Sequence, residues 1–195
     1  MGDQESRIGS PGWLNGLGFV EWVPMSHFLD DRWTEYRRRP ALQEPGLYAV
    51  ILSDGSPPVA VADRFLRTQV GPSGLALPEV PNKNKPGQWR RRWWAVEDLE
   101  ERWIEDVHLL YLGKSDPQLK VRLGQLRTFA LGGLGHTGGQ VLWHLRGYPE
   151  NLQIGVLPSS RFPTRLPAKP RDAEKQLLAE LRSYHGRLPF ANVIN

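Results

Sequence analysis

Two short apolar segments each carry a tyrosine beside a glycine. Residues 44–55 read EPGLYAVILSDG and contain Tyr48, and residues 106–117 read DVHLLYLGKSDP and contain Tyr111. A phenol both donates and accepts hydrogen bonds, and it acts as a base only where a cation or a metal lowers its pKa from about 10. The two hydroxyls could therefore orient one reacting group, or both tyrosines could be core residues with satisfied hydroxyls.

Two charged residues fall within the apolar faces of predicted helices. At 100° per residue, Arg122 lies within the apolar arc of a helix predicted over residues 116–129. Glu174 lies within the apolar arc of a helix predicted over residues 170–185. Because a buried unpaired charge costs several kcal/mol, each residue needs a partner. They could form a salt bridge with each other or extend to the surface, or both could line a cleft in which the arginine binds a phosphate and the glutamate a metal ion.

The segments that must position these residues are strands and helices with recognisable ends. Apolar runs bounded by glycine and proline predict strands over residues 46–53, 107–113 and 152–160. Asp116-Pro117 has the chemistry of a helix N-cap and first helical position, and Gly186 suits a helix C-terminal cap. We also expect a short helix that ends before Pro40 and a partly helical segment in WRRRWWAVEDLEERW.

The composition fits a single domain with room for an insertion. The chain has 195 residues, of which 39% are hydrophobic and 24% charged, and no apolar stretch approaches the roughly 20 residues that span a bilayer. It has no cysteine, which excludes disulfides, thiol nucleophiles and cysteine metal sites. The N-terminus lacks the organisation of a secretory signal, so we expect a cytoplasmic protein that does not contact a membrane.

The charge is unevenly distributed along the chain. Residues 1–106 contain 13 Lys/Arg and 16 Asp/Glu, whereas residues 107–195 contain 12 Lys/Arg and 5 Asp/Glu, so the two parts carry −3 and +7. A basic half is typical of proteins that bind nucleic acid, because cationic side chains release the counterions of the phosphates. Ordinary solubilising charge would give the same imbalance, so composition alone does not decide the function.

Taken together and in this order, these residues resemble the GIY-YIG endonuclease superfamily. Its first signature is matched by Gly46-Leu47-Tyr48, in which leucine replaces isoleucine, and its second by Tyr111-Leu112-Gly113. Its arginine, metal-binding glutamate and late asparagine match Arg122, Glu174 and Asn192. Either tripeptide alone arises readily by chance, whereas the ordered set of five is considerably more specific. The resemblance covers residues 44–55 and 105–195.

The resemblance implies an α/β (α+β) fold with a small three-stranded, mainly antiparallel sheet flanked by helices. Residues 1–43 would form an N-terminal extension that packs on the core, and residues 44–195 would form the nuclease-like domain. Where the family usually has a short connection, 62 residues separate Tyr48 from Tyr111. This spacing implies an insertion at about 54–105 between the first two core strands.

A second departure from the family pattern concerns a histidine. Many members carry a histidine one helical turn after the arginine, and this chain has Leu126 there. His136, in the glycine-rich segment GLGHTGG, could serve the same purpose in catalysis or could be an ordinary exposed residue.

The activity that the resemblance implies is divalent-metal-dependent hydrolysis of DNA phosphodiester bonds. Glu174 would bind Mg²⁺, which Mn²⁺ could replace, and Arg122 would stabilise the charge that develops on the phosphate. Tyr48 would activate or orient the water, Tyr111 would hold the nucleophile or the phosphate, and Asn192 would fix the geometry. The enzyme could be of restriction, mobile-element or phage origin. A double-strand cutter with one site per chain would act as a homodimer or by sequential nicks.

Further basic residues are candidates for contacts with DNA. Lys114 follows the second signature, and Arg127 lies outside the apolar arc of its helix. In the insertion, the segment NKNKPGQWRRRWW interleaves Arg90, Arg91 and Arg92 with tryptophans, and phosphate contacts combined with indole stacking suit DNA recognition. The acidic segment AVEDLEERWIED follows directly, so these arginines could instead form ion pairs in a structural subdomain.

A second hypothesis is a catalytically weak nucleic-acid-binding protein that retains the nuclease fold. Such a protein would bind DNA in EDTA and would not cleave it with Mg²⁺ or Mn²⁺. A small-molecule enzyme finds little support, because the chain has no phosphate loop, dinucleotide fingerprint or nucleophile-elbow motif.

Overall fold

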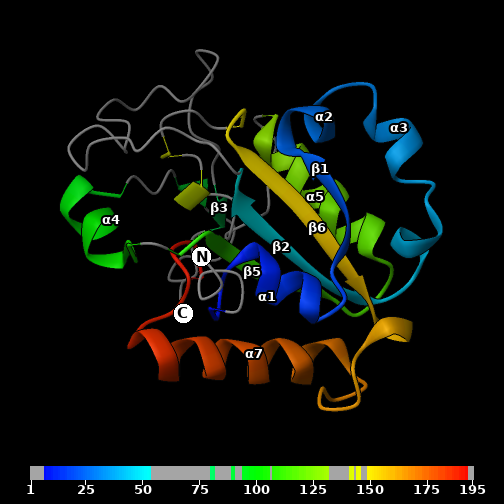
Figure 1. Ribbon diagram of the computed structural model, residues 1–195. Helices are drawn as coiled ribbons and strands as arrows, with labels where there is room; N and C mark the ends of the chain where they lie inside the picture. Colours follow the sequence, from blue (N-terminus) through cyan, green and yellow to red (C-terminus); the bar gives the residue numbers. More distant parts are fainter. Residues whose placement is uncertain are drawn as a thin grey trace.

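The computed structural model describes residues 7–53, 80–81, 89–90, 94–105, 107–131, 141–142, 144–145 and 149–192. At its centre is a four-stranded antiparallel sheet in the order β1-β6-β2-β5, with helices on both faces (Figure 1). The strands comprise Val20–Pro24 (β1), Gly46–Leu52 (β2), Leu109–Ser115 (β5) and Leu152–Pro158 (β6). The predicted class, a mixed fold built on an antiparallel sheet, is confirmed, whereas the predicted number of three strands is wrong.

The fourth strand comes from the N-terminal segment, where the sequence pattern predicts none. β1 pairs with β6 across Val20↔Val156 and Val23↔Ile154, and the register shifts between these two pairs. Within that irregularity, Glu21 has a positive φ of 57°. All five residues of β1 are half-buried, so the alternation of buried and exposed side chains that identifies a strand is missing from this segment.

The central strand β2 and the edge strand β5 are neighbours despite the long sequence between them. β2 pairs with β6 on one side and with β5 on the other, and its residues from Gly46 to Ile51 are buried. In the sequence between β2 and β5, the described residues include two short paired strands and a helix. These are β3 (Val80–Pro81), β4 (Trp89–Arg90) and α4 (Val96–Arg102).

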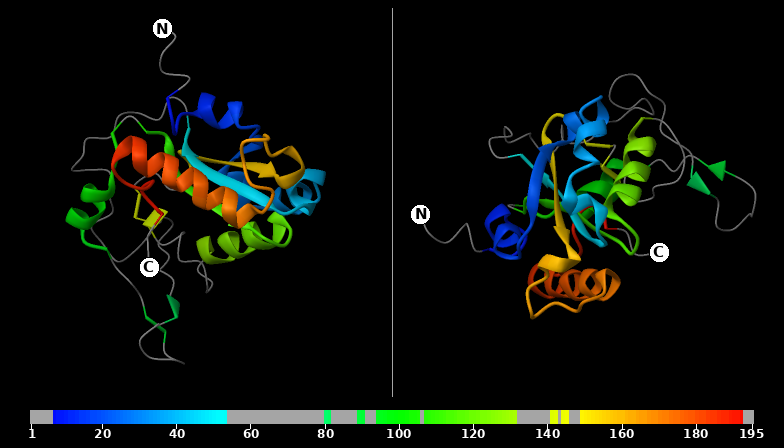
Figure 2. Two further views of the ribbon diagram at one scale, coloured as in Figure 1. Left: turned by 90° about the horizontal axis from the view of Figure 1, so that it is seen from below. Right: turned by 90° about the vertical axis from the view of Figure 1, so that its right-hand side faces the viewer.

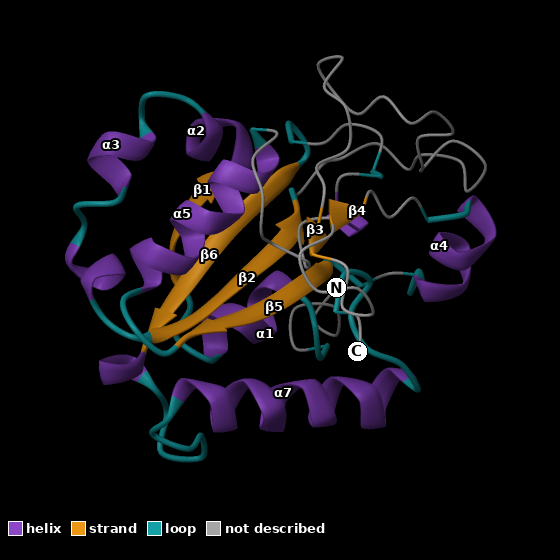
Figure 3. Ribbon diagram, turned by 180° about the vertical axis from the view of Figure 1, so that it is seen from behind, coloured by secondary structure: helices purple, strands orange, loops and turns teal. Residues whose placement is uncertain are grey.

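Helices cover the two faces of the sheet and form a separate apolar core with each. One face packs against α5 (Leu119–Ala130), α2 (Met25–Leu29) and α3 (Trp33–Tyr36). The other face packs against α7 (Pro170–His185) and α1 (Pro11–Gly16). Figure 2 shows α1 and α5 on opposite sides of the strands, and Figure 3 shows α7 running beside the edge strand β5. Both long helices, α5 and α7, therefore approach β5.

The C-terminal end of α7 agrees with the prediction, whereas the N-terminal end of α5 does not. α7 ends at His185, and Gly186 follows in the left-handed conformation with φ 74°, as its position predicts. α5 begins two residues later than predicted, with Gln118 at its N-cap and no capping side chain. Asp116 does not cap the helix, because it forms an ion pair with Lys114 instead.

The helix predicted before Pro40 is present as two short helices, α2 and α3. The Asp30 carboxylate accepts a hydrogen bond from the Arg32 backbone N–H at 2.8 Å, a local turn that competes with a continuous helix. Two short 3₁₀ helices are also present, η1 (Pro40–Gln43) before β2 and η4 (Ser159–Arg161) after β6. Within the described ranges, no helix combines the length and the apolar character needed to cross a membrane.

Candidate active site at the edge strand

The two tyrosines lie side by side on one face of the sheet. Tyr48 on β2 is opposite Gly113, and Tyr111 on β5 is opposite Val50, so the tyrosines are diagonal neighbours. Their ring centroids are 5.7 Å apart, and the rings are inclined by 44°. Tyr48 is fully buried and Tyr111 is 9% exposed. The two adjacent strands thus bring the two phenols to one place, although 62 residues separate them in the sequence.

Gly113 makes the contact between the two rings possible. A Cβ atom at Gly113 would lie 2.5 Å from Tyr48 Cζ, 2.6 Å from the Tyr48 hydroxyl oxygen and 2.7 Å from Tyr111 Cε1. Such distances are shorter than Cβ atoms tolerate, so any other residue would displace the phenols. The glycine in the second motif is therefore required by the packing of the tyrosines.

Burial keeps both phenols in the neutral form. Desolvation raises the pKa of Tyr48 well above its ordinary value and also raises the pKa of Tyr111. Arg122 opposes both increases through its charge and through hydrogen bonding. Neutral phenols donate and accept hydrogen bonds, so this arrangement favours positioning a ligand over accepting its proton.

Arg122 approaches the tyrosines from α5. It is half-buried beside the apolar face of this helix, whose buried residues are Leu119, Leu123, Leu126, Phe129 and Ala130. Its Nη1 donates a hydrogen bond to Gln125 Oε1 at 2.8 Å. Its charge lowers the pKa of Tyr48, Tyr111 and Glu174, so the guanidinium lies within electrostatic reach of all three groups.

Glu174 approaches the same strand from the N-terminal part of α7. Its side chain is half-buried, and desolvation raises its pKa to about 7, while Lys114 and then Arg122 act in the opposite direction. Within the described ranges, no residue forms a hydrogen bond or ion pair with this carboxylate. A desolvated carboxylate with cations nearby and no direct partner is suited to bind a metal ion or to take up a proton.

Two further charged residues, Asp116 and Arg171, lie near Lys114 and Glu174. Lys114 forms an ion pair with Asp116, and Arg171 Nη2 lies 3.9 Å from the same Asp116 oxygen. Asp116 raises the pKa of Glu174 and Arg171 lowers it, so both belong to the electrostatic surroundings of the site. Neither residue was among the predicted site residues. Only their positions in the sequence could have indicated them, since Asp116 lies two residues after Lys114 and Arg171 lies one helical turn before Glu174.

Asn192 contacts the outer side of the edge strand. Its Oδ1 accepts a hydrogen bond from the Leu112 N–H at 2.9 Å, and its Nδ2 donates to the Leu112 carbonyl oxygen at 2.7 Å. Leu112 lies between Tyr111 and Gly113, so Asn192 holds the backbone that carries the second tyrosine. The asparagine therefore positions the backbone of β5, and its part in the geometry of a catalytic site stays a prediction.

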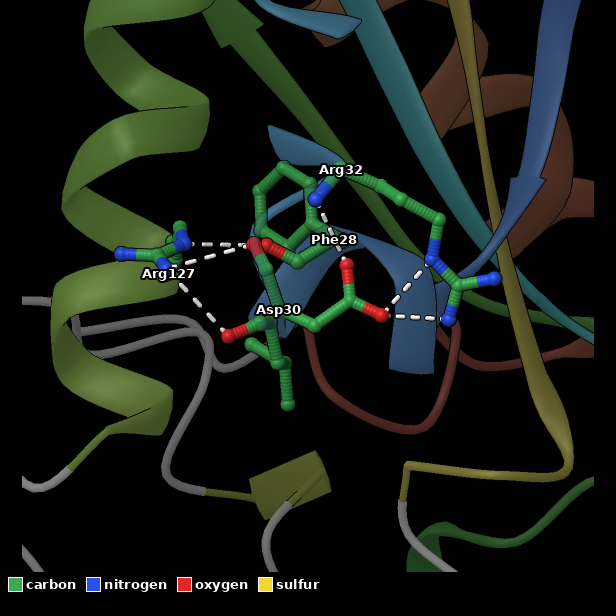
Figure 4. Close-up of polar contacts among 5 residues, drawn as sticks. Phe28, Asp30, Arg32 and Arg127 are labelled. Atoms are coloured by element: carbon green, nitrogen blue, oxygen red, sulfur yellow. Dashed lines mark hydrogen bonds and ion pairs between the residues drawn. The ribbon is translucent and has the colours of Figure 1, made fainter. Parts of the chain in front are cut away.

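Arg127 has partners on the N-terminal segment. Its Nε donates to the Phe28 carbonyl oxygen at 3.1 Å, and its Nη2 donates to those of Leu29 at 3.3 Å and Asp30 at 3.4 Å (Figure 4). These carbonyls belong to the C-terminal end of α2 and the residue after it, so Arg127 caps that helix. A contact of Arg127 with DNA remains a prediction, and the structure gives the side chain a structural role.

Four predicted residues have side chains that the structure does not describe. His136, Arg91 and Arg92 lie outside the described ranges, and Arg90 is described only as a backbone position in β4. The site assembled by the described residues therefore consists of Tyr48, Tyr111, Lys114, Arg122 and Glu174, with Asn192 behind the edge strand.

Glu174 is the candidate carboxylate ligand for a metal ion at this site. Within the described ranges, no group of three or more His, Asp and Glu side chains could hold a metal ion. Mg²⁺ keeps several of its waters and is commonly bound through one or two carboxylates together with substrate phosphates. Glu174, as an oxygen ligand without a direct partner in the described ranges, fits that mode of binding.

Comparisons of the chain with family models, curated proteins and solved structures gave no match.

Proposed function

We propose that the protein is a divalent-metal-dependent endonuclease that hydrolyses DNA phosphodiester bonds, in the manner of the GIY-YIG enzymes. The observation that supports this most strongly is the half-buried carboxylate of Glu174, which lies within electrostatic reach of Arg122 and Tyr111. A structural salt bridge, the alternative that the sequence left open, would join Arg122 to Glu174 directly. No such ion pair links these two described residues, and the Arg122 guanidinium instead donates to Gln125.

The role that we propose for each side chain follows from its chemistry. Arg122 would bind the non-bridging oxygens of the scissile phosphate, because a planar guanidinium donates parallel hydrogen bonds and stabilises the charge that develops there. The neutral hydroxyl of Tyr111 would orient the attacking water or the phosphate by a hydrogen bond, and the fully buried Tyr48 would act through its hydrogen bonding with Tyr111 and Arg122. Lys114 would add positive charge beside Glu174, and Asn192 would act only by positioning β5.

Glu174 would hold the divalent ion through its carboxylate. When bound, such an ion polarises the phosphate and lowers the pKa of a water molecule that it coordinates. Because a metal ligand must be deprotonated, the pKa of about 7 at Glu174 means that the proton competes with the metal near neutral pH.

Cleavage of supercoiled plasmid tests this proposal directly. Wild-type protein should convert plasmid to nicked or linear product with Mg²⁺ or Mn²⁺ and not with EDTA, and the ratio of the products would show whether one or both strands are cut. Glu174→Gln and Arg122→Ala should each lower the rate by at least about 100-fold, the scale for removal of one group that stabilises a transition state.

Two matched controls carry the same charge changes on exposed parts of α7. Asp172→Asn removes a carboxylate two residues from Glu174, and Arg182→Ala removes an exposed guanidinium. Both should cleave like the wild type. Persisting cleavage in Glu174→Gln and Arg122→Ala would overturn the assignment of the site. DNA binding by the wild type without cleavage in either metal would favour the second hypothesis, a nucleic-acid-binding protein that retains the nuclease fold.

A further inference from the structure

A second basic surface lies on the N-terminal segment and has no part in the chemistry proposed above. Arg37 and Arg38 directly follow α3, and both are exposed. Neither guanidinium forms a hydrogen bond or ion pair within the described ranges. The neighbouring Arg32 and Arg39, by contrast, each form an ion pair with a carboxylate. Arg37 and Arg38 are therefore the two arginines of this segment whose charge is not neutralised by a described partner.

Polar bridges fix this segment to α5, the helix that carries Arg122. Gln43 Nε2 donates a hydrogen bond to the Arg37 carbonyl oxygen at 2.7 Å, and Gln43 Oε1 accepts one from Lys120 Nζ. Nearer the start of the segment, Arg127 donates to three carbonyl oxygens at the end of α2 (Figure 4). The backbone at Arg37 is thereby tied to the first turn of α5.

Packing between α3 and α5 places Arg37 on the side of α3 that faces α5. Trp33 is buried, and a Cβ atom built on Gly124 of α5 would lie 3.8 Å from Trp33 Cζ2. Arg37 comes four residues after Trp33, a spacing that puts both side chains on the same side of a helix. Arg37 is therefore directed along the surface that α3 and α5 share.

The exposed surface of α5 carries no negative charge. The helix contains Lys120, Arg122 and Arg127 and no acidic residue. On a helical wheel, Arg122 lies on one flank of its exposed side and Lys120 on the other, with the exposed Val121 and Gln125 between them. This side of α5 therefore carries no carboxylate from Arg122 to Lys120, and the Gln43 bridge connects Lys120 to the backbone at Arg37.

We propose that this surface binds the sugar-phosphate backbone of duplex DNA to one side of the scissile phosphate. We call it the α5 track and define it as Arg37, Arg38, Lys120, Val121 and Gln125. The proposal rests on the proposed nuclease function for its choice of partner, and it adds a binding surface that the predicted DNA contacts do not include. Cationic and polar side chains with a single exposed apolar residue suit a polyanion, because phosphate contacts give affinity through counterion release.

Binding measured without catalysis tests the α5 track. Fluorescence anisotropy with a labelled DNA duplex in EDTA reports affinity while cleavage is prevented. The double variant Arg37→Ala/Arg38→Ala should bind on the order of tenfold more weakly at 0.1 M salt. The slope of log affinity against log salt should fall in magnitude by about 1 to 2, as expected for the loss of one or two phosphate contacts. The double variant Lys175→Ala/Arg182→Ala is the control, because it removes two exposed charges from α7, which packs against the other face of the sheet.

The outcomes separate this proposal from the proposed function. Arg37 and Arg38 are exposed, so both double variants should melt at the wild-type temperature, and circular dichroism checks this. Equal affinities and salt slopes for the two double variants would overturn the α5 track, even if the protein cleaves DNA. A specific loss in Arg37→Ala/Arg38→Ala would support the track, even if no cleavage is found with either metal. Absence of any wild-type binding to the duplex would overturn the proposal as well.

Discussion

Asn192 and Leu112 exchange two hydrogen bonds, one in each direction, across the outer side of β5. β5 is an edge strand, so the backbone groups on that side have no neighbouring strand to pair with. The asparagine side chain presents one acceptor and one donor in the arrangement that a strand would otherwise supply. The adjacent Ala191 N–H also donates to the Leu110 carbonyl oxygen, at 2.8 Å. The end of the described chain thus completes the edge of the sheet beside Tyr111.

Replacement of Asn192 should therefore loosen β5 locally. Asn192→Ala removes both hydrogen bonds and should lower the free energy of unfolding by about 1 to 3 kcal/mol, because two backbone groups lose their partner. Asn192→Asp keeps an acceptor for the Leu112 N–H but places a carboxylate oxygen against the Leu112 carbonyl, so it should not restore stability. Urea denaturation measures the loss, and hydrogen exchange at the Leu112 amide should become faster. Unchanged exchange at that amide in Asn192→Ala would contradict the bracing role.

Substitution of Gly113 should disturb the packing of the two phenols. In Gly113→Ala the new methyl group meets Tyr48 and Tyr111 at 2.5 to 2.7 Å, so the rings must move. We expect a destabilisation of about 1 to 3 kcal/mol, the range for overpacked cores, measured by chemical denaturation. Gly16→Ala is the matched control, because a Cβ atom there has no neighbour within 4 Å and Gly16 ends helix α1. A similar effect of both substitutions would show that the phenols do not require the glycine.

Much of the site could be predicted because its residues violate local patterns. Arg122 and Glu174 interrupt the apolar arcs of amphipathic helices, and such interruptions can be read from the sequence alone. Tyr48 and Tyr111 could be paired because the two motifs mark strands that become neighbours in the sheet. The later start of α5 was harder to predict, because the ion pair between Lys114 and Asp116 competes with the capping role of Asp116.

Other features depend on contacts between distant parts of the chain. β1 is half-buried along its whole length and is defined by its pairing with β6, more than 100 residues later, so its own sequence has no clear period. The partners of Arg127 lie in residues 28–30, and nothing near Arg127 in the sequence indicates them. The same applies to the Gln43 bridge between Arg37 and Lys120.

Stability should depend on pH through Glu174. Its folded pKa of about 7 lies above its ordinary value of 4.5, so between these values the unfolded chain loses the proton while the folded protein keeps it. The free energy of unfolding of the wild type, relative to Glu174→Gln, should be constant below pH 4.5 and fall as the pH rises to about 7. We expect a fall on the order of 1 to 2 kcal/mol, since partial exposure reduces the full effect of the shift.

Denaturation with urea at pH 4, 5.5, 7 and 8 measures this difference. Addition of Mg²⁺ at pH 8 should raise the stability of the wild type and leave that of Glu174→Gln unchanged, because only the wild type offers a carboxylate to the ion. Parallel pH profiles for the two proteins would contradict the burial of Glu174 as the cause of its raised pKa.

Arg127 offers a test that separates structure from DNA binding. Arg127→Met keeps an aliphatic side chain but removes the charged donors to the carbonyls of Phe28, Leu29 and Asp30, so the free energy of unfolding should fall by about 2 kcal/mol. The exposed Arg182→Met should have little effect. Because the guanidinium is engaged by the end of α2, the salt dependence of DNA binding should be the same in Arg127→Met as in the wild type. The opposite pattern, unchanged stability with a salt slope smaller by about 1, would assign Arg127 to a phosphate contact and would mean that the side chain leaves the α2 carbonyls when DNA binds.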